Sequence, residues 1–237
     1  MLCSDATTNR ESTDSHFLRT ALTACMHAPT VPAELSAALR TRVEACIPPL
    51  HGWTTVDKGV RLAELVVATQ PALSVELGVF GGRGTISLAI GHEALEHGHV
   101  VAVDPWERAA SLDGVNAPEN AEWWGKLDHE AIYQSFLKAL ADSRLASLCR
   151  VLRQRSDVAV GEFEDRSIGV LHQDSNHSEQ ISSAEVELWA PKLRGGALWI
   201  ADDTDWPTTQ HAQALLVHKG FALIEDHASW KVFRKGR

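Results

Sequence analysis

Short apolar runs alternate with amphipathic stretches over most of the chain after about residue 72. Each apolar run has the length of a buried strand, and each intervening stretch places apolar residues at helical spacing. Strands that alternate with helices predict a mainly parallel sheet with helices on both faces, which is a doubly wound α/β fold. The last two of the seven expected strands predict an antiparallel hairpin at one edge. The seven are ALSVELGV, HVVAVDPW, RVLRQRS, SIGVLHQD, GALWIADD, FALIEDH and SWKVFRK.

The first 70 residues lack this alternation. Residues 1–15 are rich in Ser, Thr, Asp and Asn, which predicts disorder. Residues 16–70 predict an N-terminal helical cap, because three stretches have apolar residues at helical spacing. These stretches are HFLRTALTACMH, PAELSAALRTRVEAC and TTVDKGVRLAELVVAT, with Thr55 placed to cap the third. We therefore expect a single domain over residues 16–237.

Residues 105–128 form an unusually long connection between a predicted strand and the next helix. The segment carries Trp106, Trp123 and Trp124 among polar residues. Loops at the carboxyl ends of parallel strands often cover active sites. We expect this segment to be a lid over a substrate, and the alternative is a packed structural insertion.

The composition is that of an ordinary globular protein, with 44% hydrophobic and 22% charged residues in a chain of 237. The formal net charge of −9 argues against nucleic acid or an anionic membrane as a partner, because both select clustered Lys and Arg. The four cysteines have no C-x-x-C spacing, and the chain shows no secretory signal and no apolar run long enough for a membrane span. A cytoplasmic enzyme that acts on small molecules is the expectation.

A glycine-rich turn, ELGVFGGRGT, follows the first predicted strand from Glu76 to Thr85. Glycines allow a sharp turn and a close approach to a ligand, and the N–H groups that open the next helix suit a polar ligand group. Asp104 ends the second strand, where a carboxylate can accept hydrogen bonds from both ribose hydroxyls. A nicotinamide dinucleotide would require G-x-G-x-x-G, and Glu76 would repel its pyrophosphate. Glu76 would instead attract the α-ammonium of a methionine group, which favours S-adenosylmethionine as the cofactor.

Carboxylates gather at the ends of the fourth and fifth predicted strands as Asp174, Asp202 and Asp203. The carboxyl ends of parallel strands meet at one crevice, so these side chains are expected to converge. Three such carboxylates repel one another unless they are protonated or neutralised, and hard oxygen ligands suit Mg²⁺ or Mn²⁺ better than zinc. His177 follows Asp174 by one helical turn, and its imidazole is a candidate base for a hydroxyl held by the metal.

The other histidines and the tryptophans are expected to divide between the core, the surface and an acceptor pocket. His172 lies within the fourth predicted strand and is expected to be a core residue. Three histidines crowd a helix–strand connection and are expected at the surface: His92, His97 and His99. Five tryptophans near the predicted site loops are candidates for an apolar or aromatic acceptor pocket: Trp53, Trp106, Trp123, Trp124 and Trp206. The remaining three are expected to pack structurally: Trp189, Trp199 and Trp230.

The ordered set of motifs resembles class I S-adenosylmethionine-dependent methyltransferases. It comprises the E-x-G-x-x-x-G turn, the VDPW run, the stretch WWGKLDHEAIYQSFLKAL and the segment LHQDSNHSEQ…LWAPKLRGGALWIADDTDW. Over roughly residues 52–221 the chain is similar to the small bacterial metal-dependent O-methyltransferases of the macrolide-sugar and catechol type. This resemblance implies a Rossmann-like fold.

The resemblance also implies roles for single residues. The cofactor site would be lined by Glu76, Gly78, Gly82, Asp104 and Asp174, with Ser156 and Asp157 approaching the adenine. Apart from the resemblance, Trp106 is a candidate to stack near the cofactor. The metal would be held by Asp174, Asp202 and Asp203, with His177 as the catalytic base beside Asp174. The chain departs from the pattern at Gln173 and Ser175, where an aliphatic residue and a glycine are typical, and Ser175 is expected to strain the turn that presents Asp174.

The expected function is metal-assisted methylation of a hydroxyl on a small secondary-metabolite acceptor, and the N-terminal helices are a candidate homodimer contact. One rival keeps the fold and cofactor but lacks the metal; it methylates nitrogen or carbon, or uses the sulfonium for another alkylation or a ring closure. Two rivals of other classes are a nicotinamide oxidoreductase and a catalytically silent cofactor-binding protein. Activity that survives chelation by EDTA would favour the metal-free rival over the expected function, and binding of NAD(P) would favour the oxidoreductase.

Overall fold

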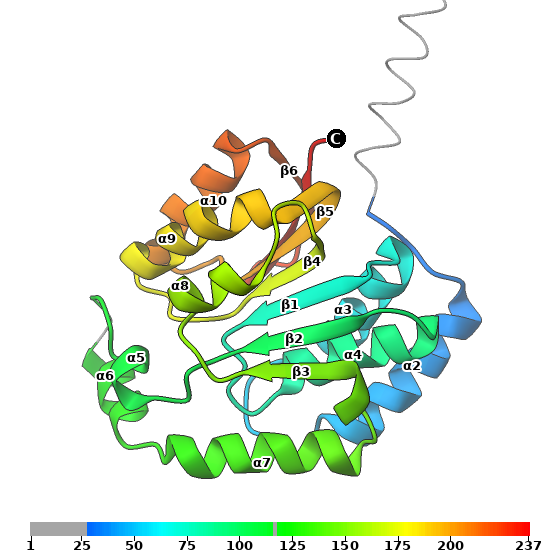
Figure 1. The fold of residues 1–237 in the computed structure, drawn as a ribbon, viewed down its shortest axis with the longest axis horizontal. Helices are drawn as coiled ribbons and strands as arrows, with labels where there is room; N and C mark the ends of the chain where they lie inside the picture. The colour runs from blue at the N-terminus through cyan, green and yellow to red at the C-terminus, as the bar shows by residue number, and fades with distance from the viewer. Residues whose placement is uncertain (1–27, 116–117) are drawn as a thin grey trace, which may run out of the picture.

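A seven-stranded sheet forms the centre of the computed structural model, which describes residues 28–115 and 118–237 (Figure 1). The strands lie in the order β3-β2-β1-β4-β5-β7-β6. Neighbouring strands are parallel except where β7 pairs antiparallel with β5 and β6. The predicted fold class, including the edge hairpin, is confirmed. The strands are β1 Leu73–Leu77, β2 His99–Val103, β3 Cys149–Leu152, β4 Ile168–Gln173, β5 Leu193–Asp202, β6 Phe221–Asp226 and β7 Trp230–Lys235.

Helices cover both faces of the sheet (Figure 1). One face carries α2 (Ala33–Cys46), α3 (Val56–Thr69), α4 (Arg83–Leu95) and α7 (His129–Asp142). The other carries α8 (Ser156–Ala159), α9 (Glu179–Trp189) and α10 (Gln210–His218). Two short helices, α5 (Arg108–Ser111) and α6 (Pro118–Gly125), lie beyond the ends toward which the arrows of β1 and β2 point.

The N-terminal helices agree with the sequence as far as the structure describes them. The predicted second and third helices are confirmed as α2 and α3. The predicted disorder over 1–15 and the predicted helix over 16–27 lie outside the described residues. Within the residues that the structure does describe, no helix is both long enough and apolar enough to cross a membrane.

The sheet separates two hydrophobic clusters, because successive side chains of a strand point to opposite faces. On β2, Val100 and Ala102 pack with α2, α3, α4 and α7, whereas Val101 and Val103 pack with α9 and α10. A strand that is buried on both faces needs apolar residues at every position. This is why the strands stand out in the sequence as unbroken apolar runs.

The helix α3 carries a charged side chain into the protein. Thr55 caps its first turn as predicted, since the Thr55 hydroxyl accepts a hydrogen bond from the Lys58 amide at 3.2 Å. The helix ends at Gln70, whose φ of 48° is left-handed. The Lys58 side chain, one turn from the start, is only 8% exposed. A lysine buried to this degree requires anionic partners, and these come from the sheet.

Two local predictions differ from the structure. The segment 105–128, predicted as a loop, contains α5 and α6. His92, predicted at the surface, is fully buried, with Nε2 2.9 Å from the Ser74 hydroxyl and Nδ1 2.8 Å from the His97 carbonyl. Both partners lie outside the helix that carries His92, so helical periodicity gave no sign of them. His97 and His99 are exposed, as predicted.

Candidate active site

A cavity of about 610 Å³ opens at the carboxyl ends of β1, β2, β4 and β5. Its size suits a small molecule or a cofactor, and its position is where open α/β sheets bind ligands. Eight residues predicted for the site line it: Glu76, Gly78, Asp104, Ser156, Asp174, His177, Asp202 and Asp203. Three others predicted for the site are not part of its wall: Gly82, Trp106 and Asp157.

The turn after β1 is held in place by the carboxylate of Asp104. Asp104 Oδ2 accepts hydrogen bonds from the amides of Val79 at 2.8 Å and Phe80 at 2.9 Å, and Oδ1 accepts one from the Trp106 amide at 2.6 Å. Burial raises the pKa of Asp104, although these three amides oppose the shift. Gly78 has a φ of +80°, and a Cβ there would lie 2.2 Å from the Asp174 carbonyl oxygen. The turn therefore requires glycine at this position.

Gly82 and Trp106 pack in the core and do not line the cavity. A Cβ at Gly82 would lie 2.2 Å from the ring of Phe136, so glycine is needed there for packing. The Trp106 ring is 3% exposed, lies 4.7 Å from the Tyr133 ring and stacks on Phe136 at 5.6 Å. Its Nε1 donates to the Phe80 carbonyl at 2.9 Å. The structure therefore places both residues in the core and does not bring the Trp106 indole to the cofactor cavity.

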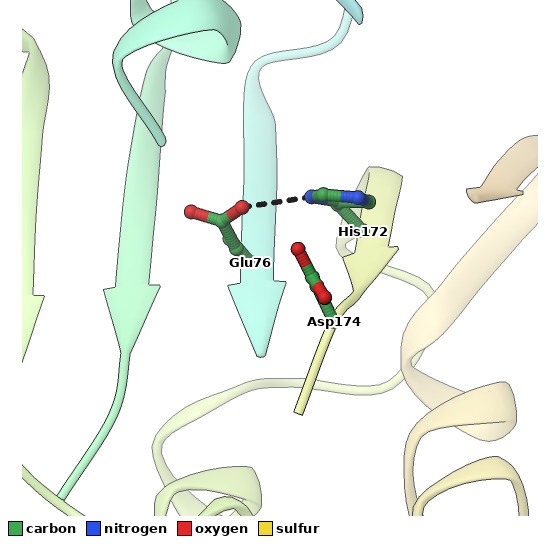
Figure 2. A group of neighbouring side chains, drawn as sticks. All are labelled: Glu76, His172 and Asp174. Atoms are coloured by element: carbon green, nitrogen blue, oxygen red, sulfur yellow. Dashed lines mark hydrogen bonds and ion pairs between the residues drawn. The ribbon is translucent and has the colours of Figure 1, made fainter. Parts of the chain in front are cut away.

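A chain of buried charges runs beneath the cavity. His172 Nδ1 lies 2.7 Å from Glu76 Oε1, and Figure 2 shows Asp174 beside this pair. Glu76 also accepts a hydrogen bond from the Thr85 hydroxyl. His172 Nε2 lies 3.7 Å from Asp202 Oδ2. Burial lowers the pKa of His172, but the carboxylates of Asp202 and Glu76 outweigh burial and raise it to about 9. His172 is therefore a core residue, as predicted, and its carboxylate neighbours favour its protonated form.

Lys58 completes this chain, and the sequence analysis did not predict it. Its ammonium donates to Asp202 Oδ2 and lies 5.8 Å from the centre of the Trp230 ring. Burial opposes the charge on Lys58, but Asp174 and Asp202 raise its pKa. Burial likewise opposes charge on Asp202, but His172 and Lys58 lower its pKa. Its buried position on an amphipathic helix was the one signal in the sequence that could have identified Lys58.

A second cluster, Asp174, His177 and Asp203, stands at the wall of the cavity. His177 Nε2 lies 2.7 Å from Asp203 Oδ2 and 3.9 Å from Asp174 Oδ1. One ligand atom from each residue lies within 4.8 Å of the others. Burial lowers the pKa of His177, but Asp203 and Asp174 raise it above its ordinary value. Burial and then the nearby Asp202 raise the pKa of Asp174.

Asp202 is held differently from the other two predicted metal ligands. Within the described part of the chain, two groups of residues have the spacing of metal ligands: Asp174 with His177 and Asp203, and Glu76 with His172 and Asp174. Neither group contains Asp202, whose Oδ2 accepts from Lys58 and whose Oδ1 accepts from the Asp203 amide at 3.0 Å. The first group offers two carboxylates at the cavity wall, which are oxygen ligands of the kind that Mg²⁺ or Mn²⁺ prefers, and an imidazole, which Mg²⁺ binds less readily.

The turn after β4 is not strained at Ser175. Ser175 is absent from the residues with positive φ, so a side chain is tolerated where a glycine was expected. Its hydroxyl donates to Glu185 Oε2 at 2.6 Å. The prediction of strain at Ser175 is therefore wrong, because a partner on α9 holds the serine in ordinary backbone geometry.

Aromatic rings form the rim of the cavity. Trp53 stacks on Phe80 at 5.5 Å, and Trp123 and Trp124 of α6 lie 5.0 Å and 6.2 Å from Trp53. Trp53 is 66% exposed and Trp123 42%, so this rim presents an apolar surface at the mouth. Trp206 and Trp230 also line the cavity, whereas Trp189 and Trp199 are fully buried in the core. Trp230 was predicted to pack structurally, and it does pack in the core, but it also lines the cavity.

Comparison with known proteins places this site in a family. A family model described as a methyltransferase domain matches residues 75–204, which is more than half of the chain. Uncharacterized protein y4gI of Sinorhizobium fredii is 29% identical over 145 residues, which are 60% of this chain and 14% of that protein. The chain thus spans only a small part of that relative's length.

Solved structures show the same fold. The O-methyltransferase TomG from Streptomyces achromogenes, involved in tomaymycin synthesis and solved with S-adenosylmethionine, is 18% identical over 94% of each chain, with a TM-score of 0.53. The Podospora anserina methyltransferase PaMTH1, solved with S-adenosylhomocysteine, is 11% identical over the full length of both chains, with a TM-score of 0.56. The family match over residues 75–204 shows that the chain belongs to the methyltransferase-domain family, and these solved structures show that it has the fold of methyltransferases crystallised with S-adenosylmethionine or S-adenosylhomocysteine.

Proposed function

We propose that this enzyme is a divalent-cation-assisted O-methyltransferase that acts on a hydroxyl group of a small secondary-metabolite acceptor. The observation that carries the proposal is the convergence of Asp174, His177 and Asp203 at the wall of the cavity, within 4.8 Å of one another. A methyl acceptor with a hydroxyl group needs a charge that polarises its oxygen and a base that takes its proton, and this cluster offers both.

The cofactor-binding residues in this proposal are Glu76, Gly78, Asp104 and Ser156, all of which line the cavity. S-adenosylmethionine supplies a methyl group that its sulfonium has already activated. The protein therefore has to hold the donor and acceptor in line and exclude water. Asp104 Oδ2 fixes the turn after β1 and Oδ1 accepts from the Trp106 amide, and the same carboxylate lines the cavity where the ribose would bind.

The metal-binding residues in this proposal are Asp174 and Asp203, with Asp202 beside them. A bound Mg²⁺ or Mn²⁺ would lower the pKa of the acceptor hydroxyl and fix its position. Lys58 holds one oxygen of Asp202, which orients this carboxylate and offsets part of the negative charge of the cluster before any cation binds. His177 would accept the hydroxyl proton at the ring nitrogen that does not face Asp203, because its Nε2 lies 2.7 Å from Asp203 Oδ2, and Asp203 would stabilise the resulting imidazolium.

The acceptor site in this proposal is the aromatic rim. Trp53, Phe80, Trp123 and Trp124 surround the mouth, and Trp206 places its ring 5.4 Å from His177 in an edge-on arrangement. An acceptor with an apolar body would pack against these rings and direct its hydroxyl inward to His177. The segment 105–128 supplies two of the rings, in keeping with a role as a lid.

A metal-independent methyltransferase is the second candidate, and Lys58 is the observation that favours it. A buried ammonium group that donates to Asp202 already supplies positive charge beneath the cavity. Such an enzyme would orient its acceptor without a divalent cation and could methylate nitrogen or carbon. The two candidates differ in how they respond to chelation.

The test combines chelation with substitution of Asp203. We expect EDTA to lower the rate of S-adenosylhomocysteine release, measured over a panel of phenols and sugar glycosides, by at least about 100-fold, and added Mg²⁺ or Mn²⁺ to restore it. Asp203→Asn should cause a loss of similar size and weaken binding of Mn²⁺ detected by electron paramagnetic resonance. Asp142→Asn, at an exposed carboxylate of α7, is the matched control. Full activity in EDTA would favour the metal-independent candidate.

A further inference from the structure

A buried acid on α9 faces the cavity with one oxygen unused. The Glu185 side chain is 2% exposed and borders the cavity. Its Oε2 accepts hydrogen bonds from Gln173 Nε2 at 2.9 Å and from the Ser175 hydroxyl at 2.6 Å. Its Oε1 is buried and has no hydrogen-bond partner among the described residues. A buried oxygen without a partner costs free energy, which points to a donor that arrives with a ligand.

The surroundings of Glu185 differ from those of the proposed metal cluster. Ser156, Ser175 and Ile181 share this part of the cavity wall with it. Ser156 opens α8 just after β3, and Ser175 follows β4, so this wall lies between the ends of two strands. The Ser156 hydroxyl is close enough to Glu185 to favour the charged carboxylate, although burial raises the pKa of Glu185 overall. The wall thus combines an acceptor oxygen, two hydroxyls and one apolar side chain.

Adenine has the groups that match this wall. Its exocyclic amine is a donor, the adjacent ring nitrogen is an acceptor, and its faces are apolar. A carboxylate oxygen can accept from the amine, and Ile181 can pack against a face of the ring. Asp104, the residue proposed to bind the ribose, lines the same cavity as Glu185, so one nucleoside can reach both residues.

Asp157 is poorly placed for this role, although the resemblance assigned it to the adenine. Its carboxylate is 53% exposed, pairs with Arg155 at 3.3 Å and is not part of the cavity wall. The neighbouring Ser156 does line the cavity. The acid that can meet the base therefore comes from α9, about 30 residues further along the chain than the sequence suggested.

We propose that Glu185 recognises the adenine of the cofactor by accepting a hydrogen bond from its exocyclic amine at Oε1. Glu185 would then determine which nucleobase the enzyme accepts, while Gln173 and Ser175 hold its carboxylate in place. The proposal rests on the use of S-adenosylmethionine and does not depend on the metal or on the acceptor.

The test measures which base the protein prefers, by calorimetric titration in EDTA. The ligands are S-adenosylhomocysteine and S-inosylhomocysteine, in which a carbonyl replaces the amine. The wild type should prefer the adenosyl ligand by roughly tenfold or more, because the carbonyl would face a carboxylate oxygen. In Glu185→Gln the preference should shrink to within about threefold or reverse, because the amide can donate to the carbonyl. Asp157→Asn, the matched control, should keep the wild-type preference.

The possible outcomes separate a wrong assignment of Glu185 from a wrong assignment of the cofactor. An unchanged preference in Glu185→Gln, in a variant with the wild-type circular dichroism spectrum, would overturn the assignment of Glu185 alone. A second measurement needs no variant: the wild type should bind an analogue with an unsubstituted purine about fivefold more weakly or worse, and equal binding would also overturn the assignment. If folded wild-type protein binds none of these nucleosides, use of the cofactor fails together with this inference.

Discussion

Lys58 shows how a single buried charge can support an active site. Its ammonium, 8% exposed, donates to Asp202, which is itself only 13% exposed. Removing the cation would leave the buried Asp202 carboxylate with only the more distant His172, 3.7 Å away, and the Asp203 amide, and loss of one partner of a buried ion pair is among the costliest single changes in a protein interior. The side chain therefore stabilises the fold and fixes the orientation of Asp202 at the same time.

We predict that Lys58→Met lowers the free energy of unfolding by about 3 kcal/mol and reduces methyl transfer more than it reduces binding of S-adenosylhomocysteine. Urea denaturation and calorimetry would measure the two effects. Adding Asp202→Asn to Lys58→Met should recover part of the lost stability, since the unpaired charge is then absent. Lys126→Met, at an exposed lysine just after α6, should change stability by less than about 0.5 kcal/mol. A stability loss of the same size in both lysine variants would contradict this account.

Residues at strand ends could be located from the sequence, and buried polar residues on helices could not. Asp104, Asp174 and Asp203 follow apolar runs, and parallel strands bring such ends together. Lys58 and Glu185 lie within amphipathic helices, where a charged residue normally indicates the solvent face. Lys58 shares the apolar stripe of α3 with Leu62 and Leu65, but the partners of Lys58 and Glu185 are far away in the chain, so only the folded arrangement shows what these side chains contact.

An ion pair fastens the helix α3 to the edge strand β6. Arg61 donates to both oxygens of Glu225, from Nε at 3.0 Å and from a terminal nitrogen at 2.6 Å. The side chains are only 17% and 9% exposed, so solvent screens the pair weakly. Two-point contacts of this kind fix direction as well as distance. The pair therefore sets how α3, and with it Lys58, is oriented against the sheet.

We predict that Arg61→Ala destabilises the protein by about 2 kcal/mol, whereas Arg40→Ala, at an exposed pair with Asp57, costs less than about 0.5 kcal/mol.

Burial opposes charge on Glu225, but Arg61 and His227 hold its pKa below the ordinary value of 4.5. A lowered pKa contributes stability above pH 4.5 that is lost as the pH falls toward the folded value. Acid unfolding curves should therefore fall less steeply in Arg61→Ala, and equal slopes would contradict the assignment.

The elements themselves were largely predictable, and their arrangement was not. Each of the seven predicted runs became a strand; the central strands, buried on both faces, are mostly apolar, whereas β3 and β6 at the edges of the sheet are partly exposed. The helices α5 and α6 escaped prediction because they are short and polar, so no apolar stripe marked them. The position of β7 between β5 and β6 depends on tertiary pairing, which periodicity does not contain.

At the scale of the molecule, the segment 105–128 and the loop after β4 enclose the cavity together. Asn176 Nδ2 donates to the carbonyls of Ala110 at 3.1 Å and Asp113 at 2.8 Å, which ties the segment to the strand that presents Asp174. Trp123 and Trp124 extend the enclosure to the mouth. A nucleoside that fills the cavity would contact both sides of this enclosure.

We predict that S-adenosylhomocysteine slows amide hydrogen exchange in α6 by at least about threefold, because the ligand makes opening of the segment less frequent. Mass spectrometry of peptides covering residues 118–125 would measure the rate. The helix α10, which does not line this cavity, should exchange at the same rate with and without the ligand. Unchanged exchange in α6 at saturating ligand would support the alternative of a packed structural insertion.

The inward position of β7 also has a consequence for synthesis. Translation delivers β5 well before residues 230–235, which must enter the sheet between β5 and β6. Until they emerge from the ribosome, the outer edge of β5 presents unpaired backbone groups beside Trp199 and Ile200, the kind of edge that recruits foreign strands. A nascent chain is thus most exposed to aggregation between the emergence of β5 and that of β7, and products truncated before Trp230 should depend heavily on chaperones or be degraded.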